Sequence, residues 1–222
     1  MVKLQLIGVG TGRCGTRYVA KLLSSAGLLC GHEYFFSYPG LVEARRRLGQ
    51  ERNAYVGDAS WLAVPLLESP ELRDALVVHI VRHPKAVIES MLRVPPGLAP
   101  PYDAYLRRHL PIMWAYDEEI DRDALRYVGW NRWIERLCAD GRPYVRYRVE
   151  DGPMALFELM QEVGAVNKLP NEGDLFSNTK CNTKGAEREH VEADPDAINF
   201  MLRVQLREVT QEYGYDWPGL TG

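Results

Sequence analysis

The stretch "GVGTGRCGTRYVAKLL", residues 8–23, decides the fold. The apolar run "KLQLIGV" at 3–9 predicts a buried strand just before it, and the stretch itself leads into a predicted helix over 16–26. Gly27 is expected to end that helix. A glycine-rich turn between a strand and a helix is typical of a loop that holds a phosphate or similar anion at the helix N-terminus.

Strands and helices alternate along the rest of the chain. Apolar runs predict further strands at 28–33, 54–60, 75–82 and 143–151, of which "ALVVHIVR" at 75–82 is the strongest. Helices are expected at 41–49, 84–92, 153–164 and 192–213. Because the strand cores are continuous apolar runs, we expect a mainly parallel sheet covered on both faces, a three-layer α/β/α fold. Ligands of such sheets bind at the carboxyl ends of the strands.

Length and composition favour an ordinary globular protein. The 222 residues fit one domain over 1–222, and the net charge of −3 argues against bulk binding to nucleic acid or anionic membrane. The start lacks the features of a signal peptide, and no apolar run reaches the roughly 18 residues of a membrane span. We therefore expect a cytoplasmic protein. Its cysteines show no zinc-site spacing and are expected to be reduced thiols: Cys14, Cys30, Cys138 and Cys181.

The glycine loop is open to three interpretations. Gly10 to Gly15 reads GxGxxG, and Glu33 follows about twenty residues later, where a dinucleotide-binding fold places its ribose-binding acid. The same span has the GxxxxG spacing of a nucleoside-triphosphate loop. However, Thr16 and Arg17 stand where that motif requires Lys and then Ser or Thr, which disfavours a magnesium-dependent kinase or hydrolase.

The third interpretation takes residues 12–16, "GRCGT", as the unit. Arg13 supplies a cation within the turn, and Thr16 supplies a hydroxyl where the helix begins. The helix N-terminus adds its positive dipole end, so a phosphate or a sulfate-like anion is favoured there.

A second motif follows the strongest predicted strand. In "RHPKAVIES", residues 82–90, Arg82 ends the strand, Pro84 begins a helix and Ser90 lies two turns further on. An arginine at a strand end and a serine on the next helix can converge on one phosphate, because the guanidinium fork and the hydroxyl both donate to its oxygens.

These two motifs, in this order, resemble those of the sulfotransferases that use 3′-phosphoadenosine 5′-phosphosulfate (PAPS). In that family a [K/R]-S-G-T-[T/S] loop holds the 5′-phosphosulfate, and an R-x-P-x-x-x-[I/V]-x-S segment holds the 3′-phosphate. The likeness covers residues 3–92 and implies a P-loop NTPase-like fold. Further along it is thin: "YRVED" is similar to a late strand, and Lys184 with Gly185 is similar to a C-terminal loop at the 3′-phosphate.

The resemblance implies which residues act on the nucleotide. Arg13 would neutralise the leaving phosphate, and Arg82 with Ser90 would clamp the 3′-phosphate, without a metal. Cys14 replaces the usual serine, and Arg17 replaces a threonine or serine, so Arg17 either adds charge at the phosphosulfate or points to solvent. The nucleotide-binding set is Gly12, Arg13, Cys14, Gly15, Thr16, Arg17, Arg82, Ser90, Lys184 and Gly185.

A general base should accept the proton of the acceptor hydroxyl or amine. Family members use His or Glu, and some bacterial and protein-modifying members place a Glu soon after the first helix. Glu33 is therefore our first choice and His32 the second. A glutamate beside aromatic residues is expected to have a raised pKa. The alternative is that Glu33 forms a surface ion pair with an arginine of residues 45–47.

The expected function is transfer of a sulfuryl group from PAPS by in-line displacement. The alternatives are an NAD(P)-binding oxidoreductase and a non-catalytic nucleotide-binding relative. The acceptor, whether a small metabolite, carbohydrate, lipid or peptide tyrosine, is not readable, nor is the oligomeric state. Residues 94–140 interrupt the α/β pattern with the connector "VPPGLAPP" and a largely helical insertion, whose first part, 94–112, is expected to frame the acceptor site.

Overall fold

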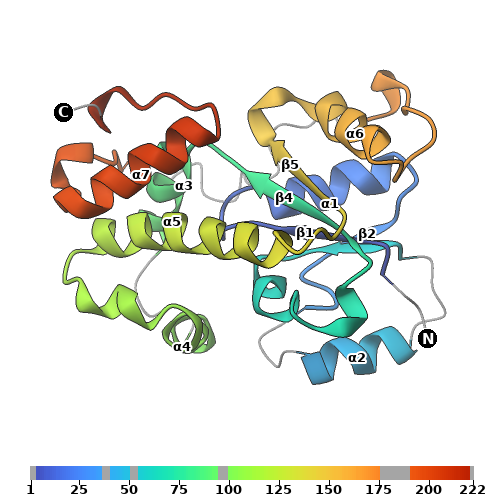
Figure 1. Cartoon of the computed structure of the whole chain (residues 1–222), viewed down its shortest axis with the longest axis horizontal. Coiled ribbons are helices and arrows are strands. Elements are labelled where there is room, and N and C mark those ends of the chain that lie inside the picture. Colours follow the sequence, from blue (N-terminus) through green and yellow to red (C-terminus); the bar gives the residue numbers. More distant parts are fainter. Residues whose placement is uncertain (1–3, 37–40, 51–54, 95–99, 176–190, 221–222) are drawn as a thin grey trace.

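A five-stranded parallel sheet forms the centre of the protein (Figure 1). The computed structural model describes residues 4–36, 41–50, 55–94, 100–175 and 191–220. Within them the strand order is β2-β3-β1-β4-β5, and every pair is parallel. The strands are β1 (Leu6–Val9), β2 (Cys30–His32), β3 (Gly57–Ala59), β4 (Leu76–Val81) and β5 (Tyr144–Arg148).

Helices cover both faces of this sheet, which confirms the three-layer α/β/α prediction. The α-helices are α1 (Thr16–Ser25), α2 (Leu41–Gln50), α3 (Pro84–Leu92), α4 (Pro100–His109), α5 (Glu119–Cys138), α6 (Pro153–Glu162) and α7 (Phe200–Glu212). Two 3-10 segments also matter below, η1 (Trp61–Leu66) and η3 (Pro111–Ala115).

Alternate side chains of the strands feed two separate cores. Leu6 of β1 and Val78 of β4 pack with α1 and α6 on one face. Ile7 and Val77, their neighbours in sequence, pack with η1 and α5 on the other. This period of two follows from the strand geometry, and burial on both faces explains why the strands read as unbroken apolar runs.

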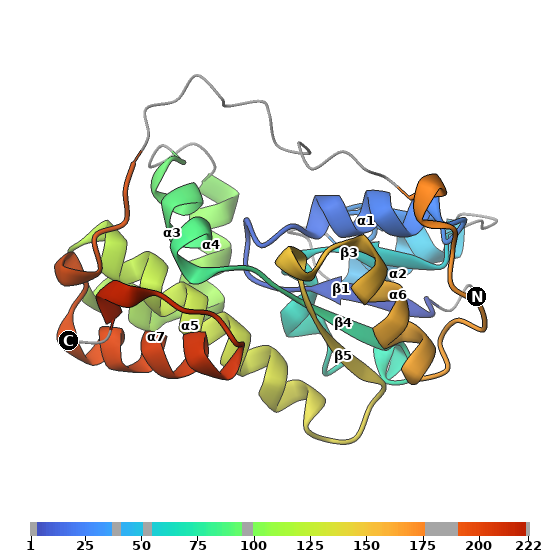
Figure 2. The same ribbon diagram turned by 90° about the horizontal axis from the view of Figure 1, so that it is seen from above.

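A third core lies beyond the sheet, where α3, α5 and α7 pack together (Figure 2). Helix α5 links this helical part to the sheet. Its residue Ala124 belongs to the third core, and its residue Ile134 belongs to the core that contains Ile7 and Val77. The predicted helical region after residue 94 is therefore observed as α4, η3 and α5. Among the described helices, none has the length and apolar character needed to cross a membrane.

Two predicted boundaries were wrong. The helix expected from 192 begins only at Phe200, because the Asn199 side chain accepts a hydrogen bond from Met201 N and caps it there, while Pro195 starts a separate turn. Helix α4 begins at Pro100, inside the predicted connector 94–101. Pro at the start of a helix loses no intrahelical hydrogen bond, so the proline pair that predicts a loop also begins a helix.

The strand order decides against a Rossmann dinucleotide fold. That fold places its second strand beside its first, in the order 3-2-1-4-5-6. Here β3 lies between β1 and β2, and β4 flanks β1 on the other side. The chain therefore leaves β1 in one direction and β4 lies in the other, which makes the carboxyl ends of β1 and β4 the switch point where such sheets bind ligands.

Candidate functional site

The glycine loop joins β1 to α1 in a tight turn at that switch point. Gly15 caps α1 with φ of 110°, and Arg13 has φ of 70°. Residues other than glycine rarely adopt a positive φ. A Cβ on Gly10 would collide with the Ile80 carbonyl of β4. The glycine at position 10 is therefore required by packing against β4, and the strain at Arg13 is held by the surrounding loop.

The structure brings the two predicted phosphate motifs together. Arg13 Nε donates to Ser90 Oγ at 2.9 Å, and Arg82 Nη1 donates to the Arg13 carbonyl at 3.3 Å. Arg13 and Ser90, which the family resemblance assigns to opposite ends of the nucleotide, are thus in direct contact. Two segments about seventy residues apart in sequence meet at one edge of the sheet.

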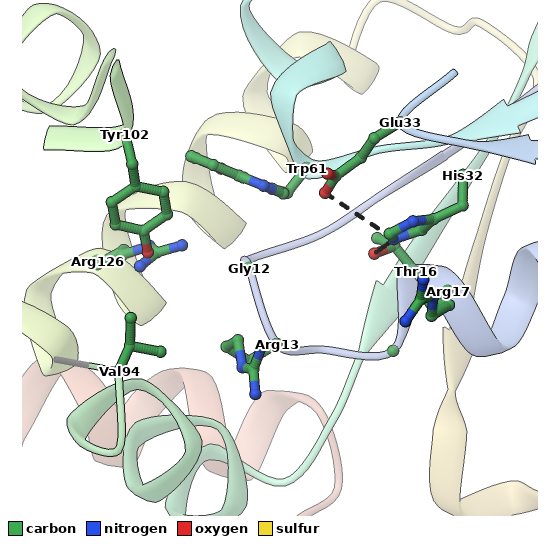
Figure 3. A pocket seen from close by; sticks show the side chains of 11 residues that line it. Gly12, Arg13, Thr16, Arg17, His32, Glu33, Trp61, Val94, Tyr102 and Arg126 are labelled. Carbon is green, nitrogen blue, oxygen red and sulfur yellow. Dashed lines mark hydrogen bonds and ion pairs between the residues drawn. The ribbon is translucent and has the colours of Figure 1, made fainter. Parts of the chain in front are cut away.

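A pocket of about 300 Å³ opens beside this loop (Figure 3). The predicted residues on its wall come from the loop, from the start of α1 and from the end of β2, whereas Val94 and residues of η1, α4 and α5 complete it. Arg17 lies on this wall rather than facing solvent alone. The lining residues are Gly12, Arg13, Gly15, Thr16, Arg17, His32, Glu33, Trp61, Val94, Tyr102 and Arg126.

Both candidate bases lie on this wall. His32 Nε2 is 3.1 Å from Thr16 Oγ1 and 3.9 Å from a carboxylate oxygen of Glu33 (Figure 3). Arg46 and Arg47 bind Glu43 on their own helix, so these two do not form the surface pair considered for Glu33. Arg45 lies outside the described side chains.

Burial shifts the pKa values of the two candidate bases in opposite directions. It raises the pKa of Glu33 above 4.5, opposed by the Arg17 charge and by the nearby Trp61 side chain. Burial, together with the Arg17 charge, lowers the pKa of His32 to about 4. Near neutral pH, His32 is therefore uncharged and binds a proton weakly. The raised pKa of Glu33 lies nearer to neutral pH than the lowered pKa of His32.

A buried carboxylate holds the Glu33 turn in place. Asp58 of β3 accepts the backbone N–H groups of Tyr34, Phe35 and Phe36, each at 3.2 Å. The pKa of Asp58 is raised to about 7, because the effect of burial outweighs the opposing effect of the backbone hydrogen bonds from Phe35 and Phe36. Glu33 itself has φ of 54°, so the three bonds fix a backbone that the residue does not favour by itself.

The opposite wall is aromatic and carries one cation. Arg126 of α5 is only 2% exposed, and its Cζ lies 5.0 Å from the Trp61 ring and 4.8 Å from the Tyr102 ring. A Cβ on Gly12 would collide with Nη2 of Arg126, so this guanidinium closes against the backbone of the glycine loop. The glycine loop and helix α5 therefore meet at Gly12.

Cys14 packs inward from the loop. It is 1% exposed, and burial raises the pKa of its thiol to about 12, so its side chain is a packing group and only its backbone is available to a ligand. Cys30 and Cys138 are also buried free thiols. Cys181, Lys184 and Gly185 lie outside the described residues.

Two histidines and two tryptophans that do not line the pocket have structural roles. His79 is fully buried between Tyr144 Oη at 2.8 Å and Asn131 Oδ1 at 2.9 Å. His83 caps α3 by accepting from Lys85 N. Trp130 is fully buried and Trp133 half-buried beside it.

Sequence reasoning missed Asp58, Tyr102 and Arg126. Asp58 had a signal, since a carboxylate between Gly57 and Ala59 in a buried strand needs partners. Arg126 also had one, because it lies four residues before the buried Trp130 and therefore on the apolar stripe of its helix. Within the described residues, no group of three or more His, Cys, Asp or Glu side chains is placed to hold a metal ion.

Comparison with known proteins finds a similarity of fold to a solved structure. No protein-family model matches the chain, and no curated protein does. Among solved structures, the chain is similar to a sulfotransferase from Alicyclobacillus acidocaldarius, with a TM-score of 0.52, 14% identity and full coverage of both chains. At this identity the likeness concerns the fold alone.

Proposed function

We propose that this protein is a sulfotransferase that moves a sulfuryl group from PAPS to an acceptor hydroxyl or amine. The observation that carries the proposal is the meeting of Arg13, Arg82 and Ser90 at the switch point between β1 and β4. A Rossmann oxidoreductase gives these three side chains no role, and the strand order already excludes its sheet. The fold shared with a solved sulfotransferase supports the same conclusion.

The residues at the switch point fit a nucleotide that carries phosphates at both ends of its ribose. The N-terminus of α1 supplies backbone N–H groups and a positive dipole end, and Arg13 and Arg17 add two charges at its mouth. A cation in the first turn of a helix opposes the dipole and destabilises the empty protein, so the position of Arg17 is explained by a bound anion. Arg82 and Ser90 would hold the 3′-phosphate.

The chemistry then divides between the two sides of the pocket. Glu33 accepts the proton of the acceptor hydroxyl as its oxygen bonds to sulfur, and the bond from sulfur to the 5′-phosphate oxygen breaks. Arg13 and the N-terminus of α1 stabilise the charge that develops on that phosphate. His32, uncharged and bonded to Thr16, positions the loop beside Glu33 rather than carrying the proton.

The test is a transfer assay with PAPS labelled in its sulfuryl group and a mixture of hydroxyl and amine compounds, with products identified by mass spectrometry. We expect a labelled product with the wild-type protein and a severe loss with Glu33→Gln. A protein that binds 3′,5′-adenosine bisphosphate but transfers label to no acceptor would instead be a non-catalytic relative. A protein that binds neither nucleotide contradicts the proposal.

A further inference from the structure

The buried guanidinium on the aromatic wall indicates the chemistry of the acceptor. We propose that the acceptor carries an anionic group, a carboxylate or a sulfate ester, which Arg126 binds while the reacting hydroxyl faces Glu33. The inference rests on the proposed function, because it assigns a substrate class to the same pocket.

Arg126 comes from the acceptor side of the pocket and reaches the glycine loop at Gly12. It comes from α5, and its neighbours on the wall are Tyr102 of α4 and Val94, all within the helical part of the chain. The clamp residues Arg82 and Ser90 are absent from the pocket lining. Figure 3 shows Arg126 and Tyr102 together on one side of the pocket, with His32 and Arg17 on the other.

The surroundings of Arg126 hold a guanidinium in place and strengthen its field. Two aromatic rings lie within about 5 Å of its Cζ, which is within the range of cation–π attraction. Water is largely excluded, since the residue is 2% exposed. A charge in such a site interacts more strongly with a ligand anion than a surface arginine does, and its planar fork matches a carboxylate or sulfate.

Trp61 lies on the pocket wall with both this cation and the proposed base. Its ring centroid is 5.0 Å from Arg126 Cζ. Figure 3 shows the Trp61 ring between Arg126 and Glu33, so the pocket presents a cation on one side of this ring and the proposed base on the other. An acceptor with a hydroxyl at one end and an anionic group at the other would contact the proposed base and the guanidinium together.

The experiment measures binding to the full chain saturated with 3′,5′-adenosine bisphosphate, so that the nucleotide phosphates already occupy the clamp. Calorimetric titrations compare two matched pairs, glucuronate with glucose and 4-hydroxybenzoate with 4-hydroxybenzamide. We expect the charged member of at least one pair to bind tenfold or more tightly than its neutral partner. Arg126→Gln should abolish that preference, Arg126→Lys should retain part of it, and the exposed control Arg108→Gln should not change it.

Equal binding within both pairs, including no detectable binding of any compound, overturns the inference, as does a preference that survives in Arg126→Gln. A folded Arg126→Gln variant with weakened adenosine bisphosphate binding also overturns it, because Arg126 would then serve the nucleotide. Arg126→Lys covers the case in which Arg126→Gln does not fold. If the wild-type chain fails to bind the nucleotide, the proposed function fails separately, and the same pairs are titrated without it.

Discussion

The two sides of the pocket are built in different ways. The nucleotide side consists of a short loop, a strand end and helix α3, which contact each other through Arg13, Arg82 and Ser90. The acceptor side is assembled from η1, α4 and α5, and its contacts are between side chains, such as Trp61 with Tyr102 at 5.2 Å between ring centroids. The first is built from two motifs that the sequence makes recognisable, and the second from the packing of three helical segments, so substitutions on each side should have separable effects.

The largest effect is expected from substitution of the proposed base, which should reduce turnover without weakening nucleotide binding. Glu33→Gln keeps the size of the side chain and removes its basicity, so kcat should fall by about 100- to 10,000-fold. The Kd for 3′,5′-adenosine bisphosphate should stay unchanged, because Glu33 does not belong to the clamp. Steady-state kinetics and calorimetry check the two halves, and a loss of nucleotide affinity would show that the sides are not separate.

The clamp is tested next. Arg82→Ala removes charge-assisted hydrogen bonds that contribute about 1.5–3 kcal/mol, so the Kd for adenosine bisphosphate should rise by about 10- to 150-fold. Arg82→Lys should recover only part of this, since lysine lacks the planar fork. Arg108→Ala, on the exposed face of α4, is the matched loss of charge and should leave the Kd unchanged. An Arg82→Ala protein with wild-type affinity would contradict the clamp.

Asp58 tests whether the turn that carries Glu33 is held from below. Asp58→Asn places an amide against backbone N–H donors and should lower the free energy of unfolding by about 1–3 kcal/mol. It should also lower kcat while leaving nucleotide affinity intact. Denaturant unfolding measures the first effect, with the exposed Asp117→Asn as the control. Unchanged stability and activity would show that the three hydrogen bonds do not position the turn.

The smallest effect concerns pH. Glu33 must be deprotonated to act, so kcat/KM should rise with pH through its raised pKa, and the acid limb should lie above pH 4.5. The Arg17 charge stabilises the carboxylate, so Arg17→Gln should move that limb to higher pH. A limb that shifts downward, or that persists in Glu33→Gln, would assign it to another group.

The same contrast explains what sequence reasoning could reach. The parallel sheet and the glycine loop follow from local patterns. The meeting of Arg13 with Arg82 follows as well, because each residue comes after the carboxyl end of a predicted strand, and the carboxyl ends of parallel strands lie at the same edge of the sheet. For the acceptor side, the sequence predicts that the segment 94–112 frames the site, and helical spacing places Arg126 on the apolar stripe of α5. Which of these side chains enter the pocket depends on how α4 and α5 pack against η1. The start of α7 at Phe200 was missed for a smaller reason, because the cap at Asn199 overrides the apolar period before it.

The central claim is that Arg13 and Arg82 grip one nucleotide at the switch point. The most direct measurement is calorimetry of the wild-type chain with 3′,5′-adenosine bisphosphate, NAD and ATP with magnesium, repeated on Arg13→Ala and Arg82→Ala. The account predicts one site that prefers adenosine bisphosphate over the other two and loses affinity in both variants. Tighter binding of NAD or magnesium-ATP, or affinity that neither substitution reduces, would contradict it.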